Sequence, residues 1–340
     1  MARNRILPIF VPQRGCPHQC VFCDQRTISG CHRPVTAADV TRLLTEALPL
    51  AGQGMEVAFY GGSFTAIPAE QQQELLDAVE PFLETGAVAS VRVSTRPDAI
   101  TPEALERLRR GGVRTVELGC QSMDDVVLNA SGRGHGREVV APAVALLRQY
   151  GFSVILQMMT GLPEQTDKNA LETAHALAAL QPDGVRLYPT VVVRGTALAE
   201  RYADGSYRPQ TLEEATALGA EILELFLRSD IPVLRIGLQP SEELAQSVMA
   251  GPYHPALGEL VKSRVYRNRA QALLETVPPG SNAVLAVAPN RVSLMTGQKR
   301  CNVHWLRQRY GLNSLRIVPE PMEDWEIRLQ SSESLDKINR

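Results

Sequence analysis

The alternation of short apolar segments with longer helical patterns constrains the fold of this chain more than any other feature. Seven segments rich in β-branched and other apolar residues predict strands, at residues 6–12, 55–60, 90–95, 113–119, 152–158, 184–189 and 231–236. Start signals at Thr36 and Thr101 and helical patterns over residues 69–83, 137–150, 167–180 and 212–228 predict the intervening helices. This order predicts a parallel sheet with right-handed crossovers, either an open doubly wound sheet or a complete or partial barrel.

In all of these folds, the loops at the carboxyl ends of the strands carry the chemistry. Glycines and polar residues gather at those ends in this sequence. They are Gly61-Gly62-Ser63-Phe64, Arg96-Pro97-Asp98, Cys120-Gln121-Ser122, Thr160-Gly161-Leu162-Pro163 and residues 190–194, which follow the second to sixth predicted strands in turn. We therefore expect the functional site at this edge of the sheet.

The alternation ends near residue 255, where a different pattern begins. A basic helix over residues 257–275, strands at 283–288 and 291–295, a helix at 299–310 and a strand at 315–319 predict a small α+β appendage. We therefore expect a barrel or sheet domain over residues 1–250, the appendage over residues 251–330 and a frayed tail over residues 331–340.

Composition and charge limit the function classes. The chain has 340 residues, of which 44% are hydrophobic and 21% are charged, as is usual for a globular protein. With no apolar run of about 18 residues and no signal-peptide pattern, we expect a cytoplasmic protein without a membrane partner. The net charge of −2 hides a basic stretch, residues 255–316, with ten Lys and Arg against two Glu. That stretch indicates either an anionic partner or solvated helix faces.

Three of the six cysteines, Cys16, Cys20 and Cys23, have the spacing C-x3-C-x2-C. Three thiolates on one loop are able to bind three irons of a cubane cluster, which leaves the fourth iron open to a small chelating molecule. The alternative is a zinc site with Cys31, His18 or His32 as fourth ligand, but such sites usually come as two separated pairs. The spacing therefore favours an iron–sulfur cluster, and we expect Cys31, Cys120 and Cys301 to take no part in it.

The loop from Cys16 to Cys23, with Phe22 before the third cysteine, resembles the signature of the radical S-adenosylmethionine superfamily. The resemblance implies an enzyme with a partial (β/α)6 barrel, a 4Fe–4S cluster and S-adenosyl-L-methionine as cofactors. The segment Tyr60-Gly61-Gly62-Ser63-Phe64 is similar to the glycine-rich segment that holds the methionine amino group in that superfamily. The resemblance therefore implies cofactor binding by Phe22, Gly61, Gly62, Ser63 and Phe64.

A finer resemblance is to the elongator catalytic-subunit family, which acts on the wobble uridine of transfer RNA. It covers roughly residues 5–240 and rests on Ser94-Thr95-Arg96-Pro97-Asp98, Val116-Glu117-Leu118-Gly119-Cys120-Gln121-Ser122, Arg133-Gly134-His135, Gly161-Leu162-Pro163, Tyr188-Pro189-Thr190 and Arg194-Gly195-Thr196. The Gly-Leu-Pro and Gly-Gly segments are also similar to anaerobic coproporphyrinogen oxidase. The first cysteine gap is one residue shorter than elongator-type proteins have, and the resemblance does not include an acetyltransferase domain. The resemblance therefore does not imply that this chain makes the carboxymethyl-type product of the elongator family.

Five polar residues become candidates through their places in these motifs. Glu117 and Gln121 are predicted to hold a ribose of the cofactor, with a helix cap or a salt bridge in the barrel as the alternative. Arg96 and Arg133 are predicted to contact the carboxylate of S-adenosylmethionine or an anionic substrate, with an ion pair as the alternative. Arg133 and Tyr188 are the catalytic candidates, and Tyr188 has a role in the barrel wall as its alternative.

The resemblance implies a mechanism in which ferredoxin or flavodoxin reduces the cluster, which cleaves S-adenosylmethionine to methionine and a 5′-deoxyadenosyl radical. The radical removes a hydrogen atom from the substrate. We expect the substrate to be RNA, with transfer RNA as the first case. The alternatives are a radical enzyme acting on a small molecule, such as a tetrapyrrole or metabolite, and a non-catalytic, metal-stabilised RNA-binding protein.

The basic segment from Arg291 to Arg300 predicts a strand, a turn with a glycine and the start of a helix. A helix start offers free N–H groups to a phosphate, and Lys299 and Arg300 add positive charge there. These two residues are therefore the candidates for RNA binding. Trp305 is predicted to stack on a base or to anchor the appendage in its core.

Overall fold

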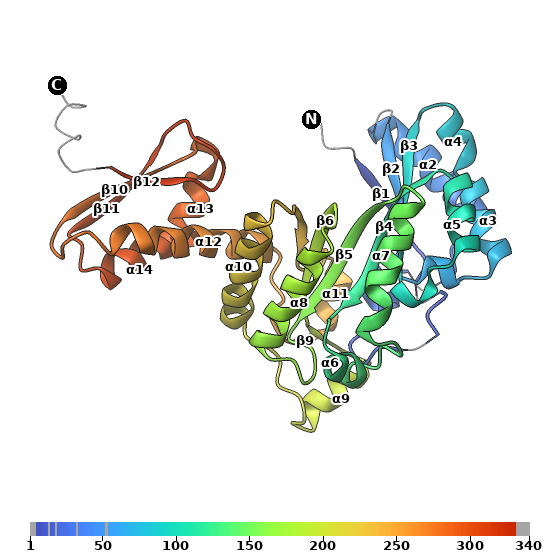
Figure 1. The fold of residues 1–340 in the computed structure, drawn as a ribbon, viewed down its shortest axis with the longest axis horizontal. Coiled ribbons are helices and arrows are strands. Elements are labelled where there is room, and N and C mark those ends of the chain that lie inside the picture. The colour runs from blue at the N-terminus through green and yellow to red at the C-terminus, as the bar shows by residue number, and fades with distance from the viewer. Residues whose placement is uncertain (1–4, 13, 18, 32, 52–53, 331–340) are drawn as a thin grey trace. The chain divides into compact units, whose positions relative to one another are not determined.

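The computed structural model describes residues 5–12, 14–17, 19–31, 33–51 and 54–330 (Figure 1). The chain divides into two compact units. The first contains residues 1–212 and 225–253, and the second contains residues 213–224 and 254–340. The frayed tail predicted for residues 331–340 lies outside the described residues. In the part that the structure describes, no helix has the length and apolar character needed to cross a membrane.

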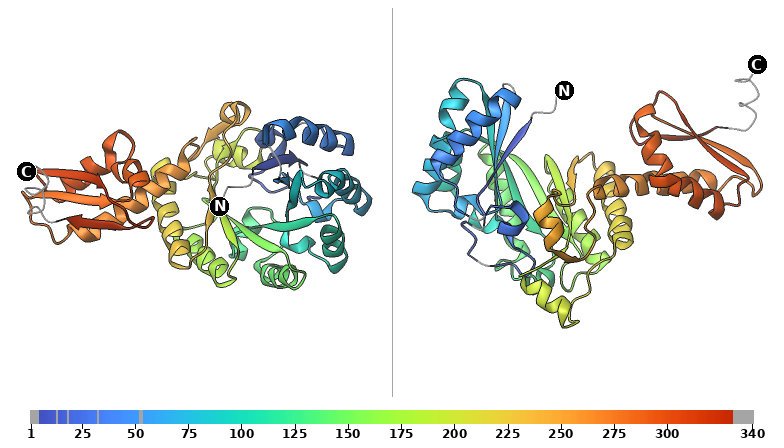
Figure 2. Two further views of the ribbon diagram at one scale, coloured as in Figure 1. Left: turned by 90° about the horizontal axis from the view of Figure 1, so that it is seen from above. Right: turned by 180° about the vertical axis from the view of Figure 1, so that it is seen from behind.

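The first unit is built on a seven-stranded sheet in which all neighbouring strands are parallel. Its strands are β1 (Ile6–Phe10), β2 (Met55–Tyr60), β3 (Val88–Thr95), β4 (Val113–Gln121), β5 (Ser153–Thr160), β6 (Gly184–Pro189) and β8 (Val233–Ile236). All seven predicted strands are confirmed. The order β1-β2-β3-β4-β5-β6-β8 follows the sequence without the reversal of a doubly wound sheet. The sheet curls into a partial barrel with helices on its outer side (Figure 2).

Helices and short elements connect these strands. The helices are α1 (Gln25–Ser29), α2 (Ala37–Ala51), α3 (Ala69–Asp77), α4 (Glu80–Glu84), α5 (Pro102–Arg110), α6 (Asp125–Ala130), α7 (Val140–Gln149), α8 (Asp167–Ala179), α9 (Ala197–Ala203), α10 (Leu212–Arg228) and α11 (Glu242–Ser247). The 3-10 turns are η1 (Phe64–Ala66), η2 (Pro97–Ala99) and η3 (Arg137–Val139), and β7 (Val192–Val193) pairs with β9 (Val248–Ala250) in antiparallel fashion.

The helix starts follow the capping signals of the sequence. The Thr36 hydroxyl accepts from the Asp39 amide at 3.2 Å, and the Asp39 carboxylate accepts from the Thr36 amide at 3.1 Å, which confirms a capping box. The helix predicted over residues 69–83 is wrong in one respect, because it is divided into α3 and α4. The reason is Pro81 in the first turn of α4, since proline has no N–H group to continue a helix.

The two faces of the curled sheet differ in chemistry. In β3, Val91 and Val93 are fully buried, whereas the alternate residues Arg92 and Ser94 line a cavity. Side chains alternate between the two faces of a strand, so one face meets the surrounding helices and the other faces the lumen of the partial barrel. Polar residues at every second position of a strand are thereby directed into one shared space.

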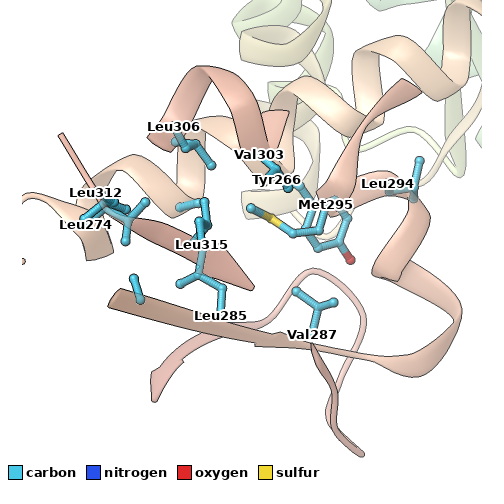
Figure 3. Packing of buried hydrophobic residues seen from close by; sticks show 12 residues of the cluster. Tyr266, Leu274, Leu285, Val287, Leu294, Met295, Val303, Leu306, Leu312 and Leu315 are labelled. Carbon is cyan, nitrogen blue, oxygen red and sulfur yellow. The ribbon is translucent and has the colours of Figure 1, made fainter. Parts of the chain in front are cut away.

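The second unit is a small α+β fold. Its elements are α12 (Leu257–Leu274), β10 (Asn282–Val287), η4 (Pro289–Arg291), α13 (Val292–Thr296), η5 (Gln298–Arg300), α14 (Cys301–Arg309), β11 (Ser314–Pro319) and β12 (Ile327–Gln330). β10 lies between β11, to which it is parallel, and β12, to which it is antiparallel. Figure 3 shows its core, in which Tyr266, Leu285 and Met295 come together from α12, β10 and α13.

The strand predicted at residues 291–295 is wrong, because residues 292–296 form the helix α13. Leu294 and Met295 are both buried although they are adjacent, which a half-buried strand does not allow. The side-chain amide of Asn302 donates to the carbonyl oxygens of Leu294 and Met295, at 3.3 and 3.2 Å. These bonds satisfy carbonyls at the helix end and stabilise the helical form. The strand β12 was not predicted.

Candidate active site

The loop that follows β1 brings the three clustered cysteines to the carboxyl end of the sheet. The Val11 amide donates to the Tyr60 carbonyl at 2.7 Å, and the Val21 amide donates to the Ser131 carbonyl at 3.1 Å. The Leu198 amide donates to the Val21 carbonyl at 2.8 Å. The ring of Phe22 packs against a buried cluster that contains Val192, Leu198, Ala199 and Tyr207. The loop is therefore held at both ends by backbone bonds and at Phe22 by apolar contacts.

The cysteine loop and the glycine segment after β2 fit against each other without room for side chains. The Ser63 amide donates to the Arg14 carbonyl at 2.9 Å. A Cβ added at Gly62 would lie 2.5 Å from the carbonyl oxygens of Arg14 and Val11. Gly61 has φ +89°, which is unfavourable for residues with a side chain. Two neighbouring glycines are therefore required for this contact.

The three clustered cysteines face one cavity of about 1070 Å³ in the first unit, together with Phe22, Gly61 and Gly62. Of the other cofactor candidates, Ser63 and Phe64 are fully buried and are not among the residues that line the cavity. The Ser63 hydroxyl is 3.0 Å from the Thr95 hydroxyl, and Phe64 lies on Phe59 with 5.0 Å between ring centroids. Both residues therefore pack beneath the glycine segment, on the side away from the cavity.

The surroundings of the thiols differ among the three cysteines. Burial and the nearby Cys20 raise the pKa of the Cys16 thiol, and the same two causes raise the pKa of Cys23 to about 12. The Cys20 sulfur accepts a hydrogen bond from Nη1 of Arg133 at 3.3 Å. A bound metal reverses the effect of burial, since a coordinating thiol loses its proton. Arg133 supplies positive charge beside the central sulfur.

The cavity is suited to a cubane cluster in the way its cysteines are placed. Within the described residues, no three His, Cys, Asp or Glu side chains form a group that would hold a single metal ion. The ligands of a cubane cluster each bind a different iron, so they need to face one space rather than meet at one point. Cys16, Cys20 and Cys23 meet that requirement. Of the residues considered as the fourth ligand of a zinc site, His18 and His32 lie outside the described residues, and Cys31 is not among the residues that line the cavity.

Arg96 and Arg133 both line the cavity, and both are nearly buried, with exposed fractions of 4% and 6%. Arg96 forms a two-point ion pair with Asp98 at 2.9 and 2.8 Å. Burial would raise the pKa of the Asp98 carboxyl, but its bonds to Arg96 hold that pKa below the ordinary value. Nη2 of Arg133 donates to the Gly119 carbonyl at 2.5 Å and lies 3.3 Å from Nε2 of His135.

Glu117 is the centre of a hydrogen-bond network in the lumen and is fully buried. Oε1 accepts from Tyr60, Arg92 and Arg186 at 2.9, 2.9 and 2.8 Å. Oε2 accepts from Gln157 at 2.9 Å. Burial and the Glu117 charge raise the pKa of the Tyr60 hydroxyl, which keeps it a donor. Since both carboxylate oxygens already accept bonds, Glu117 fixes the arginines of the lumen, and its contact with a ribose stays a prediction.

Gln121 and Tyr188 complete the set of predicted residues. An irregularity in the pairing of β4 with β5 between Gly119 and Gln121 gives Gln121 a φ of +67°. Its Oε1 is buried without a hydrogen-bond partner among the described residues. Gln121 therefore has an acceptor left for a ligand of the cavity. The Tyr188 hydroxyl accepts from Nη1 of Arg186 at 3.2 Å, and burial raises its pKa.

Sequence reasoning missed three arginines of the lumen, which are Arg92, Arg186 and Arg235. Each of them lies between apolar residues inside a strand: Val91-Arg92-Val93, Val185-Arg186-Leu187 and Leu234-Arg235-Ile236. The outer face of a strand covered by helices is apolar, so a charged residue at the alternate position must face the lumen. This alternation of apolar and charged residues would have identified the three arginines from the sequence.

Replacing Glu117 with glutamine is expected to lower the free energy of unfolding by about 3 kcal/mol, because the change leaves buried guanidinium groups without their carboxylate. Denaturant unfolding of the purified protein measures the difference. The exposed pair of Glu106 with Arg109 on α5 provides the control, and Glu106→Gln should change stability by no more than about 0.5 kcal/mol. Equal stability of the two variants would show that the network does not hold the lumen together.

The sequence matches the Radical SAM superfamily over residues 10–177 and the Radical SAM C-terminal domain over residues 182–267. Together with the partial barrel and a three-cysteine loop beside a glycine segment, these matches define the class of protein. The chain belongs to the radical SAM superfamily and is an enzyme of that class. Enzymes of this class use S-adenosylmethionine and a 4Fe–4S cluster.

Sequence relatives narrow the similarity within the superfamily. An uncharacterized protein of Methanocaldococcus jannaschii is 30% identical over 223 residues, covering 62% of this chain and 68% of the relative. Human Elongator complex protein 3 is 29% identical over 248 residues, covering 66% of this chain and 45% of the relative. The tRNA uridine(34) acetyltransferase of Dehalococcoides mccartyi is 37% identical over 136 residues, covering 39% and 30%. The chain thus spans less than half of the length of the latter two proteins.

Solved structures agree with the fold. The Methanocaldococcus infernus Elp3 with an N-terminal deletion superimposes with a TM-score of 0.61 at 22% identity, covering 78% of this chain and 64% of that one. Coproporphyrinogen III oxidase of Escherichia coli, a radical SAM enzyme, gives a TM-score of 0.51 at 19% identity, covering 66% and 53%. At these identities the likeness shows the fold alone.

Proposed function

We propose that this radical SAM enzyme modifies RNA and that its substrate is a transfer RNA. The observation that carries the proposal is the sequence similarity to a tRNA uridine(34) acetyltransferase and to Elongator complex protein 3. The basic stretch of residues 255–316, with ten Lys and Arg against two Glu, supports it, since RNA is a polyanion. The proposed setting is the cytoplasm, with ferredoxin or flavodoxin as the source of electrons.

In this proposal, Cys16, Cys20 and Cys23 hold the cluster, and Arg133 compensates charge beside Cys20 through its 3.3 Å hydrogen bond. Gly61 and Gly62 receive the methionine end of S-adenosylmethionine, because backbone without side chains borders the cavity there. Gln121 receives the ribose through its Oε1, which has no hydrogen-bond partner among the described residues. The cofactors, when bound, supply the electron and the 5′-deoxyadenosyl radical that removes a hydrogen atom from the substrate.

The protein's own part is to orient the substrate and to exclude water. Phe10, Met159, Pro189 and Val191 give the cavity apolar wall area. Arg186 holds the Tyr188 hydroxyl at the carboxyl end of β6, which faces the same cavity as the cysteines. Tyr188 and Arg133 are therefore proposed as the residues nearest the reacting substrate.

Several arginines of the second unit are already paired, and Lys299 and Arg300 are among its exposed cations without an ion pair in the described part of the chain. Arg264, Arg269 and Arg291 form ion pairs with Glu213, Glu224 and Asp324, so their charge is already compensated. Lys299 and Arg300 are exposed and have no salt bridge within the described part of the chain. They lie directly before the nine-residue helix α14, with φ of +50° and +62°. The exposed fraction of Trp305 is 36%, and Arg267 lies over its ring at 4.5 Å.

Changing Lys299 and Arg300 to glutamate is expected to weaken RNA binding at least about tenfold in low salt. Each lost phosphate contact should also reduce the slope of log affinity against log salt by about 0.7 to 0.9. Fluorescence anisotropy with labelled transfer RNA measures both quantities, and the wild-type protein should bind at low micromolar or tighter affinity. The control with the same change of charge is Arg109→Glu with Arg110→Glu on α5, which should leave binding nearly unchanged.

The same variants test the function in cells. Total RNA from cells that lack the gene should lose one modified nucleoside, which the wild-type gene restores and the Cys23→Ala gene does not. The Lys299 and Arg300 double variant should restore only a minor part of it. RNA binding by the double variant equal to that of wild type, or no binding by either protein, would reject the RNA-binding role of Lys299 and Arg300. An unchanged nucleoside profile would reject the RNA substrate. A small-molecule substrate would then be the function to test.

A further inference from the structure

The cavity that contains the three cysteines is lined by more positive than negative side chains. The lining residues include five arginines, Arg92, Arg96, Arg133, Arg186 and Arg235, but only one carboxylate, Glu117. Arg96 is paired with Asp98, and Arg92 with Glu56 and Glu117. Arg133 lies at the Cys20 sulfur. Arg186 shares Glu117 with Arg92, and Arg235 has no ion-pair partner among the described residues.

Arg186 and Arg235 are direct neighbours in the sheet. β6 and β8 run parallel, and these two residues are register partners, so their side chains leave the same face side by side. Like charges directly opposite each other on neighbouring strands are destabilising. Nε of Arg235 donates to the Gly237 carbonyl at 2.9 Å, which satisfies one donor but leaves the charge uncompensated. The pair therefore leaves a positive charge without a counter-ion in the lumen.

Further polar and apolar groups line the cavity beside this arginine pair. The Tyr188 hydroxyl contacts Nη1 of Arg186, and the charge of Arg235 also acts on that hydroxyl by lowering its pKa against the raising effect of burial. Tyr188 and both arginines line the same cavity. Nε of Arg186 has no hydrogen-bond partner among the described residues. Pro232, Val233 and Leu234 add apolar lining on the β8 side.

We propose that Arg186, Tyr188 and Arg235 form a substrate subsite that binds an oxyanion, a phosphate or a carboxylate, of the molecule that the enzyme modifies. Guanidinium groups suit such groups, because their planar donors bind two oxygens at once. The inference rests on the proposed function only in that the anion belongs to the substrate. A phosphate fits a nucleotide of an RNA, and a carboxylate fits a small metabolite.

The subsite is distinct from the one proposed for the cofactor's own carboxylate. The methionine end of S-adenosylmethionine is assigned to the glycine segment after β2, near Arg96 and Arg133. Arg186 reaches across the lumen to the Tyr60 hydroxyl of β2 at 2.8 Å, whereas Arg235 lies on the edge strand β8 and has no hydrogen bond to β2 among the described residues. An anion held by Arg235 should therefore bind together with S-adenosylmethionine rather than compete with it.

The experiment measures how strongly the anaerobically reconstituted protein prefers a charged ligand to its neutral counterpart. Calorimetric titrations compare uridine 5′-monophosphate with uridine in one arm and succinate with succinamide in the other. Wild type should prefer the charged member by about tenfold or more in one arm, since a charge-assisted pair contributes more than about 1.4 kcal/mol. The phosphate arm points to a nucleotide and the carboxylate arm to a metabolite. Saturating S-adenosylmethionine should leave the preference in place.

Three variants make the test specific. Arg235→Gln should reduce the preference to about twofold or less, and Arg235→Lys should keep most of it because the charge remains. Arg114→Gln removes an exposed arginine from β4 and should keep it entirely. No preference in either arm of wild type, an unchanged preference in Arg235→Gln, or displacement by S-adenosylmethionine would overturn the subsite. Failure of the RNA experiments alone would not overturn the subsite, because a preference for the carboxylate ligand would still be expected.

Discussion

Replacing any one of Cys16, Cys20 and Cys23 with alanine is expected to abolish the 4Fe–4S cluster. The wild-type protein should be brown and oxygen-sensitive after anaerobic reconstitution, with iron and sulfide equivalent to one cluster. Each cysteine supplies the protein ligand of one iron, and a radical SAM cluster already has one iron without a protein ligand. If a second iron loses its cysteine, too few protein ligands remain to retain the cluster. Iron and sulfide analysis with the visible absorption spectrum measures the loss.

The other three cysteines of the chain provide matched controls for this loss. Cys31→Ala, Cys120→Ala and Cys301→Ala should retain the cluster, and Cys120 is the most stringent of them. It is fully buried near Arg133, and burial raises its pKa to about 12, so it is inert as a thiol. A sample prepared without oxygen that contains zinc and no iron would contradict the prediction, as would a cluster that survives Cys23→Ala.

Much of the fold was predictable because local pattern and tertiary environment agree. All seven strands of the sheet are short apolar segments, and α10 begins and ends at the residues that its helical pattern indicates. Buried parallel strands must be apolar on the side that faces the helices, so their sequences cannot vary freely. The partial barrel itself was predictable only through the resemblance carried by the cysteine loop, since alternation alone is equally compatible with an open sheet.

The errors occur where a distant contact decides the local structure. Residues 292–296 form a helix because Asn302 and the core around Tyr266 favour it, and neither influence is visible within the segment itself. β12 exists because β10 offers it an antiparallel partner. Short segments have weak intrinsic preferences, so tertiary contacts readily override them.

The candidate site likewise contains residues that the sequence identifies and residues that only the fold brings together. The cysteines were found by their spacing, and the Gly-Gly segment was found through its resemblance to the glycine-rich segment of the superfamily. The subsite around Arg235 joins residues of β6 and β8, whose relation depends on sheet order and register. Likewise, Glu117 was noticed as a motif residue, but its four donors come from four other strands or strand ends, Tyr60, Arg92, Gln157 and Arg186.

Gly62→Ala is expected to disrupt the active site although it adds a single methyl group. The new Cβ would lie 2.5 Å from the carbonyl oxygens of Arg14 and Val11, a distance that requires the backbone of the cysteine loop to move. Overpacking of this kind costs about 1–3 kcal/mol, which corresponds to a loss in cluster retention of roughly fivefold to 150-fold. Cleavage of S-adenosylmethionine to 5′-deoxyadenosine under dithionite should fall with it. Iron analysis and chromatography of the nucleoside product measure the two effects.

Gly151→Ala separates this steric effect from the general cost of replacing a glycine. Gly151 has φ +81°, so alanine is strained there, but no atom lies within 4 Å of the added Cβ. That variant should lose about 1 kcal/mol of stability and keep both the cluster and the cleavage reaction. If Gly62→Ala retains the cluster but loses cleavage, the glycine acts on the methionine end of the cofactor alone. Normal cleavage by Gly62→Ala would show that the cysteine loop and the glycine segment do not form the active site together.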